Sequence, residues 1–90
     1  AVSYEVAEAM ALGVLDLAQA DLAIAVTGIA GPGGGTEAKP VGLVFIGIAT
    51  KKGAKITRCH FHGDRESIRS QTVAQALSLA YNQVKEEYDD

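Results

Sequence analysis

Apolar and polar residues follow one another along this chain in patterns that predict two helices and three strands. The first pattern has a helical period and is carried by Val6, Met10, Val14 and Leu17. Ser3 stands just before it, where a hydroxyl can cap a helix N-terminus, so we expect a helix over about residues 4–18. Gly13 inside this segment indicates either close packing or a local weakness.

Three further segments have the composition of strands. The run Leu22–Val26 is too short for a helix, and Val41–Thr50 is long, apolar and rich in β-branched residues. Ala54–His62 alternates, and the preceding Lys-Lys-Gly is typical of a hairpin turn, so the last two strands are expected to be antiparallel neighbours. Gly42 and Gly47 in the middle strand indicate a bulge or a close backbone approach.

A second helix is predicted over about Arg65–Glu87, with Asp64 as its cap. Its expected apolar stripe consists of Ile68, Val73, Ala76, Leu77, Ala80 and Val84. Acidic residues at a helix C-terminus oppose the helix dipole, so no packing role is expected for Glu86–Asp90.

This order of elements predicts an α/β layer architecture with two helices and about three strands. The predicted middle strand is so apolar that burying it should require more of the protein than two helices. The chain also opens on Ala-Val-Ser, directly before the first helix. We therefore expect residues 1–90 to be the C-terminal portion of one domain, completed by a missing N-terminal part or a complementary chain, and we expect a homo-oligomer.

The composition limits which partners and which cellular compartment are expected. The chain has 90 residues, 48% hydrophobic residues, a net charge of -3 and one cysteine. Its basic residues are scattered, which argues against nucleic acid or an anionic membrane as a partner. An internal disulfide is impossible, and neither a signal peptide nor a bilayer-spanning run is present in the sequence. These features favour the cytoplasm.

The glycine-rich stretch Thr27–Pro40, TGIAGPGGGTEAKP, lies between two apolar strands. Successive glycines allow backbone N–H groups to converge on phosphate, carboxylate or oxyanion oxygens. The common nucleotide motifs do not fit, because a Walker loop would need lysine at Gly34 and a G-x-G-x-x-G motif fails at Thr36. Composition alone leaves two interpretations open, a ligand-binding loop and a long strand connection.

Few other groups suggest chemistry. Arg65 and Arg69 are four residues apart near a helix N-terminus, which suits a phosphate, although they could equally be solvated or paired with Glu66. His60 and His62 lack a third ligand, so no metal is expected. Cys59 is expected to be a core thiol. The four serines have positions typical of caps or surface residues: Ser3, Ser67, Ser70 and Ser78.

The stretch AVTGIAGPGGGT, followed by KPVG and a V-x-I-G-x-A strand, resembles the C-terminal domain of the CinA family. This family includes stand-alone bacterial nicotinamide mononucleotide (NMN) deamidases. The resemblance extends to VSYEVAEAMA in the first helix and to FHGDRESIRSQTVAQAL in the last, and so covers nearly the whole chain. It implies a three-layer α/β/α sandwich on a mixed sheet, and hydrolysis of NMN to nicotinic acid mononucleotide and ammonia without metal or cofactor.

The resemblance also implies what this chain lacks. Family members carry an upstream motif of the Glu-Ser-Cys-Thr-Gly-Gly type, whose serine is the implied nucleophile, and no such motif occurs here. The chain alone is therefore expected to be inactive, and its residues can supply only oxyanion donors and substrate contacts. The implied substrate-binding residues are Thr27, Gly28, Ile29, Ala30, Gly31, Gly33, Gly34, Gly35, Thr36, Arg65 and Arg69, with Arg69 the preferred phosphate contact.

Two other functions stay open at this stage. The chain could be a noncatalytic nucleotide- or anion-binding module, such as a degraded paralogue of the enzyme. It could also be a structural piece that completes a sheet with another chain.

Overall fold

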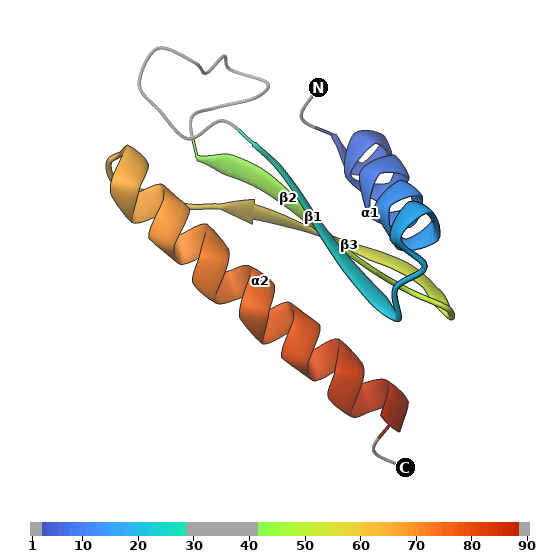
Figure 1. Cartoon of the computed structure of the whole chain (residues 1–90). Helices are drawn as coiled ribbons and strands as arrows, with labels where there is room; N and C mark the ends of the chain where they lie inside the picture. Colours follow the sequence, from blue (N-terminus) through green and yellow to red (C-terminus); the bar gives the residue numbers. More distant parts are fainter. Residues whose placement is uncertain (1–2, 29–41, 89–90) are drawn as a thin grey trace.

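The computed structural model describes residues 3–28 and 42–88, which form a sheet between two helices (Figure 1). The elements follow in the order α1 (Tyr4–Ala18), β1 (Leu22–Gly28), β2 (Leu43–Thr50), β3 (Gly53–His60) and α2 (Arg65–Tyr88). Helix α1 covers one face of the sheet and α2 covers the other. The predicted α/β layers are confirmed. Among the described residues, no helix is both long enough and apolar enough to span a bilayer.

The sheet has the strand order β1-β2-β3, and both pairs are antiparallel. Thr50 pairs with Gly53 across a two-residue turn, and Gly53 has φ 127°, which confirms the predicted hairpin. Strand β2 is buried along its whole length because it lies between two strands and two helices. The parallel pairing that a mixed sheet requires is not found among the described strands, so the mixed character of the sheet stays a prediction.

Helix α1 begins as predicted, since the Ser3 hydroxyl accepts a hydrogen bond from the backbone N–H of Val6 at 3.2 Å. The residues that carry the helical period are, however, mostly not the ones that contact the sheet. Ala7 and Ala11 are buried against the sheet, whereas Met10, Val14 and Leu17 are exposed. A periodic stripe marks an apolar flank but does not show which flank contacts the sheet, and here the small side chains do so.

Gly47 explains this close packing. A Cβ atom at Gly47 would lie 3.0 Å from the carbonyl oxygen of Ala7 and 3.3 Å from the Cβ atom of Ala11. Such contacts are tight, so the glycine allows the backbone of α1 to approach β2 closely. The expected close backbone approach is thereby confirmed.

Gly13 has a different environment, which gives a stability prediction. A Cβ atom there would meet nothing within 4 Å, so close packing does not account for the glycine. Because alanine restricts the unfolded chain and favours the helix, Gly13→Ala should raise the free energy of unfolding by about 0.5–1 kcal/mol. Urea unfolding followed by circular dichroism measures this, and a loss of stability would show that Gly13 has a contact partner after all.

Helix α2 begins at the predicted cap, where the Asp64 carboxylate accepts a hydrogen bond from the backbone N–H of Ser67 at 2.8 Å. Ile68 and Ala76 are buried over β2, as expected. The other half of the predicted apolar stripe is not in the core. Val73, Leu77 and Val84 are 59%, 62% and 43% exposed. The apolar surface of α2 is therefore wider than the sheet beneath it.

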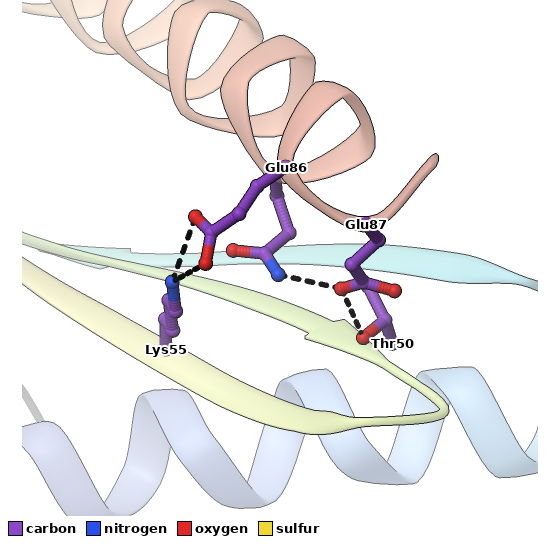
Figure 2. Close-up of polar contacts among 5 residues, drawn as sticks. Thr50, Lys55, Glu86 and Glu87 are labelled. Atoms are coloured by element: carbon purple, nitrogen blue, oxygen red, sulfur yellow. Dashed lines mark hydrogen bonds and ion pairs between the residues drawn. The ribbon is translucent and has the colours of Figure 1, made fainter. Parts of the chain in front are cut away.

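The acidic end of α2 does pack, contrary to expectation. Glu87 accepts hydrogen bonds from the buried Thr50 hydroxyl at 2.7 Å and from the Gln83 amide at 2.5 Å. Glu86 pairs with the Lys55 ammonium group at 3.1 Å (Figure 2). The prediction considered only the helix dipole, whereas local partners on β2 and β3 outweigh it. These contacts fasten the far end of α2 to the β2–β3 hairpin.

The Glu87 contacts predict a pH dependence. The hydrogen bonds from Gln83 and then Thr50 lower the pKa of Glu87 below its ordinary value. A carboxyl group with a lowered folded-state pKa stabilises the fold above its unfolded pKa, about 4.3, and this contribution disappears as the pH falls through the folded pKa. Glu87→Gln should therefore be less stable than wild type at pH 7, and the difference should shrink at pH 3.

Urea titrations of both proteins at the two pH values test this. Glu86→Gln is the matched control, because its exposed ion pair with Lys55 should matter little at either pH. An equal Glu87→Gln effect at both pH values would show that the charge of Glu87 is not what stabilises the fold.

Candidate functional site

Gly28, near the start of the glycine-rich stretch, and Gly42, two residues past its end, are both fixed to the sheet. Gly28 is the last residue of β1 and pairs with Val44, and Gly42 directly precedes β2. A Cβ atom at Gly28 would lie 2.8 Å from the carbonyl oxygen of Leu43. Gly42 has φ 89°, and a Cβ atom there would clash with the carbonyl oxygen of Phe61. Both positions therefore require glycine for reasons of space, and Gly42 also for its backbone conformation.

A pocket adjoins Gly28, the first of these residues, on the α2 face of the sheet. It has a volume of about 380 Å³ and contains one charged side chain, Arg69. Its lining residues are Val26, Gly28, Val44, Arg69, Thr72 and Val73. The structure thus brings Arg69 and Gly28, two of the predicted site residues, to one pocket from segments 41 positions apart in the sequence.

Arg65 lies further from the loop. It shares with Arg69 a shallow groove of about 810 Å³, whose lining residues all belong to α2. Neither arginine side chain makes a hydrogen bond or ion pair with another residue in the described ranges, so the predicted alternative of pairing with Glu66 is not seen there. Both guanidinium groups are exposed and available to an anion.

The N-terminus of α2 is a poorer anion site than its sequence suggested. Asp64 places its carboxylate on the N–H of Ser67, and its carbonyl oxygen accepts a hydrogen bond from the N–H of Ile68 at 2.9 Å. The cap therefore occupies these donors and adds a negative charge. An anion near this helix would have to be held by the arginine side chains rather than by the backbone.

Thr27 lies on the opposite face of the sheet from Arg69. Alternate residues of a strand face opposite sides, and Ala23 and Ala25 pack against Ala11 of α1. Thr27 continues that row, whereas Val26 and Gly28 line the pocket beside α2. The side chain of Thr27 therefore cannot share this pocket with Arg69. The other predicted positions, Ile29, Ala30, Gly31, Gly33, Gly34, Gly35 and Thr36, lie outside the described residues.

The groups set aside in the sequence analysis remain outside this site. The rings of His60 and His62 are 4.8 Å apart, and the described residues contain no cluster of three His, Cys, Asp or Glu side chains suited to a metal. Cys59 is partly buried and packs against the core cluster that includes Val44 of β2 and Ala76 of α2. Desolvation raises the pKa of its thiol. A raised thiol pKa disfavours the reactive thiolate, consistent with a structural role.

The apolar lining of the pocket was missed by sequence reasoning. Val26 and Val44 looked like ordinary strand residues, and Val73 was assigned to the core. No local pattern distinguishes them, since their proximity depends on how α2 crosses the sheet. They are recognised as lining residues only in the folded chain, where they surround Gly28 and Arg69.

Together, a glycine-rich connection between antiparallel strands and an arginine from a covering helix define this chain as an α/β sandwich protein with a loop-side pocket. The CinA C-terminal domain family matches residues 1–84. The chain belongs to the CinA family.

Relatives and solved structures agree with this assignment. The chain is 56% identical over 77 residues to a CinA-like protein of Geobacter metallireducens, a match covering 86% of this chain and 19% of that protein. The crystal structure of a CinA superfamily protein from Klebsiella pneumoniae gives a TM-score of 0.88 at 34% identity, covering 94% of this chain and 53% of that one.

A competence/damage-inducible protein of Agrobacterium tumefaciens gives a TM-score of 0.86 at 41% identity, covering 90% of this chain and 50% of that chain. This chain therefore spans about a fifth of the curated relatives and about half of the solved ones.

Proposed function

We propose that this chain is the substrate-binding part of an amidohydrolase that converts NMN to nicotinic acid mononucleotide and ammonia in cytoplasmic pyridine nucleotide salvage. Family membership supports the class of protein, and the TGIAGPGGGT stretch resembles that of the NMN deamidases. The observation that carries the proposal is the pocket shared by Gly28 and Arg69, since it sets a cation beside the glycine-rich loop.

The two ends of NMN require different groups. A phosphate is best held by a guanidinium group, which offers paired N–H donors, and Arg69 has no competing partner among the described residues. The nicotinamide carbonyl becomes an oxyanion when it is attacked, and backbone N–H donors from the glycine-rich loop would stabilise that charge. In this proposal Arg69 orients the substrate, while the loop from Gly28 onward faces the reacting amide.

In this proposal the nucleophile comes from a segment outside this chain. Ser3 caps α1, and the Ser67 hydroxyl accepts a hydrogen bond from Gln71 at 3.0 Å. Neither hydroxyl contacts a general base among the described residues, which nucleophilic catalysis by serine requires. Attack by a serine supplied from elsewhere would expel ammonia, and water would then release the acid product.

Ammonia release from NMN tests the proposal. We expect turnover when residues 1–90 are joined to a family segment that carries the serine motif, and none when that serine is replaced by alanine. Binding of NMN without turnover in the completed domain would instead favour a noncatalytic nucleotide-binding module. Absence of both would reject the proposed substrate.

A further inference from the structure

The segment that joins β3 to α2 runs past Gly42, which follows the glycine-rich stretch. In this segment the backbone N–H of Phe61 donates to the carbonyl oxygen of Gly42 at 2.9 Å. Gly42 is buried, and the Phe61 side chain packs against the core cluster that includes Val44 and Ala76. The connection is therefore fastened to the sheet where β2 begins, at the same end of the sheet as the start of α2 (Figure 1).

Gln71 of α2 reaches back to the same connection. Its side-chain amide nitrogen Nε2 lies 2.8 Å from the carbonyl oxygen of His62. The same nitrogen lies 3.2 Å from the carbonyl oxygen and 3.0 Å from the hydroxyl oxygen of Ser67. A carbonyl oxygen can only accept a hydrogen bond, so the side chain presents its N–H donors here. One side chain thus joins the connection to the first two turns of α2.

Gly63 allows this close approach. It has φ 123°, and a Cβ atom there would lie 2.9 Å from the hydroxyl oxygen and 3.0 Å from the Cβ atom of Ser67. A larger residue would push the connection away from the helix. The glycine therefore lets the His62 carbonyl come within reach of Gln71.

Arg69 lies in the part of α2 that Gln71 holds. Its guanidinium group has no hydrogen bond or ion pair among the described residues, so its place beside Gly28 depends on the orientation of this part of the helix. Ile68 is the only buried residue within 65–72, and one apolar contact does not prevent a helix from rotating about its axis. The hydrogen bond from Gln71 to His62 opposes that rotation. Residues that bind a ligand are commonly held in place by such supporting hydrogen bonds.

We propose that Gln71 is a positioning residue for the substrate phosphate. It joins the β3–α2 connection, and through it the backbone at Gly42, to the turn of α2 that carries Arg69. The guanidinium group is thereby held at a fixed distance from the glycine-rich loop. This inference rests on the function proposed above, in which Arg69 orients NMN.

Steady-state kinetics of the completed domain test the proposal. Gln71→Leu keeps the approximate size of the side chain but cannot donate a hydrogen bond. Because the phosphate is remote from the reacting amide, KM for NMN should rise about fivefold while kcat changes less than about twofold. Gln75→Leu is the matched control and should leave both constants unchanged. Gln75 lies one turn further along α2, is half-buried like Gln71, and makes no hydrogen bond among the described residues.

A double-mutant cycle separates positioning of Arg69 from a general effect on the fold. In the Arg69→Ala background no guanidinium group is left to position, so adding Gln71→Leu should raise KM less than about twofold further. An equal rise in both backgrounds would mean that Gln71 acts only on the fold, and would overturn the inference.

Hydrogen exchange of the completed domain measures the link without substrate. The Phe61 amide should exchange at least about fivefold faster in Gln71→Leu than in wild type, and at the wild-type rate in Gln75→Leu. Unchanged exchange in Gln71→Leu would overturn the inference. If the wild-type domain hydrolyses NMN and Gln71→Leu has the KM of Gln75→Leu, this inference alone is wrong. A wild-type domain that neither binds nor hydrolyses NMN would reject the proposed function, and this inference with it.

Discussion

Gly42→Ala should lower the free energy of unfolding by about 3 kcal/mol, the largest stability effect expected of a small substitution among the described residues. Two costs combine. The backbone at Gly42 has φ 89°, which alanine adopts only with strain, and the added methyl group would clash with the Phe61 carbonyl oxygen. The N–H of Phe61 donates to the carbonyl oxygen of Gly42 at 2.9 Å, so relieving the clash would separate β2 from the segment that leads to α2.

Gly53→Ala is the matched control for this prediction. Gly53 also has a positive φ, 127°, but a Cβ atom there would meet nothing within 4 Å. It should therefore show only the conformational cost of about 1 kcal/mol. Urea unfolding of both variants measures the difference, and equal losses would mean that the close approach of Phe61 contributes nothing.

Arg69→Ala should weaken NMN binding by the completed domain about 10- to 100-fold, the largest functional effect expected from the described residues. This range corresponds to the loss of a charge-assisted hydrogen bond, about 1.5–3 kcal/mol. Arg69 is exposed, and its side chain has no hydrogen bond or ion pair among the described residues, so the fold should be unaffected. Isothermal titration calorimetry, with circular dichroism as a check on folding, provides the measurement.

Controls at the same pocket show whether the phosphate is responsible. Nicotinamide riboside, which lacks the phosphate, should bind wild type and Arg69→Ala about equally. Arg65→Ala should change NMN affinity only about two- to threefold, because Arg65 lies outside the pocket that contains Gly28. An equal loss for the riboside, or a larger effect at Arg65, would mean that the phosphate is held elsewhere.

Local signals in the sequence were sufficient for the elements themselves. The caps at Ser3 and Asp64, the Lys-Lys-Gly turn and the β-branched middle strand each depend on neighbouring residues, and each was confirmed. What failed was the expectation that the whole apolar stripe of α2 packs in the core, and in α1 too the helical spacing does not mark the buried residues. Met10, Val14, Val73 and Leu77 are apolar at helical spacing, as core residues are, yet they are exposed.

The physical reason is that apolar residues at helical spacing show which side of a helix is apolar, but not whether another element packs against that side. In this chain the wide apolar flanks of both helices exceed what three strands can cover, so the sequence predicted more core than 90 residues can form. The expectation of a missing part of the domain came instead from the apolar middle strand, which is buried along its whole length here, and that expectation stays a prediction. The prediction for the acidic end of α2 failed for a different reason. Its partners, Thr50 and Lys55, come from distant positions in the sequence.

The candidate site was predictable only in part. The glycine-rich stretch and Arg69 stand out in the sequence, but nothing local shows that Gly28 and Arg69 line one pocket while Thr27 faces α1. Those relations arise from strand alternation combined with the path of α2 across the sheet. The roles of residues 29–41 remain predictions that rest on the family resemblance.

The central claim is that this chain holds the substrate and that another segment supplies the nucleophile. Its most direct test is ammonia release from NMN as residues 1–90 are titrated into the complementary family segment that carries the serine motif. We predict no release by either part alone, and a rate that rises with added chain and reaches a plateau at one chain per segment. Turnover by residues 1–90 alone would contradict the claim, as would a combined pair that binds NMN but releases no ammonia.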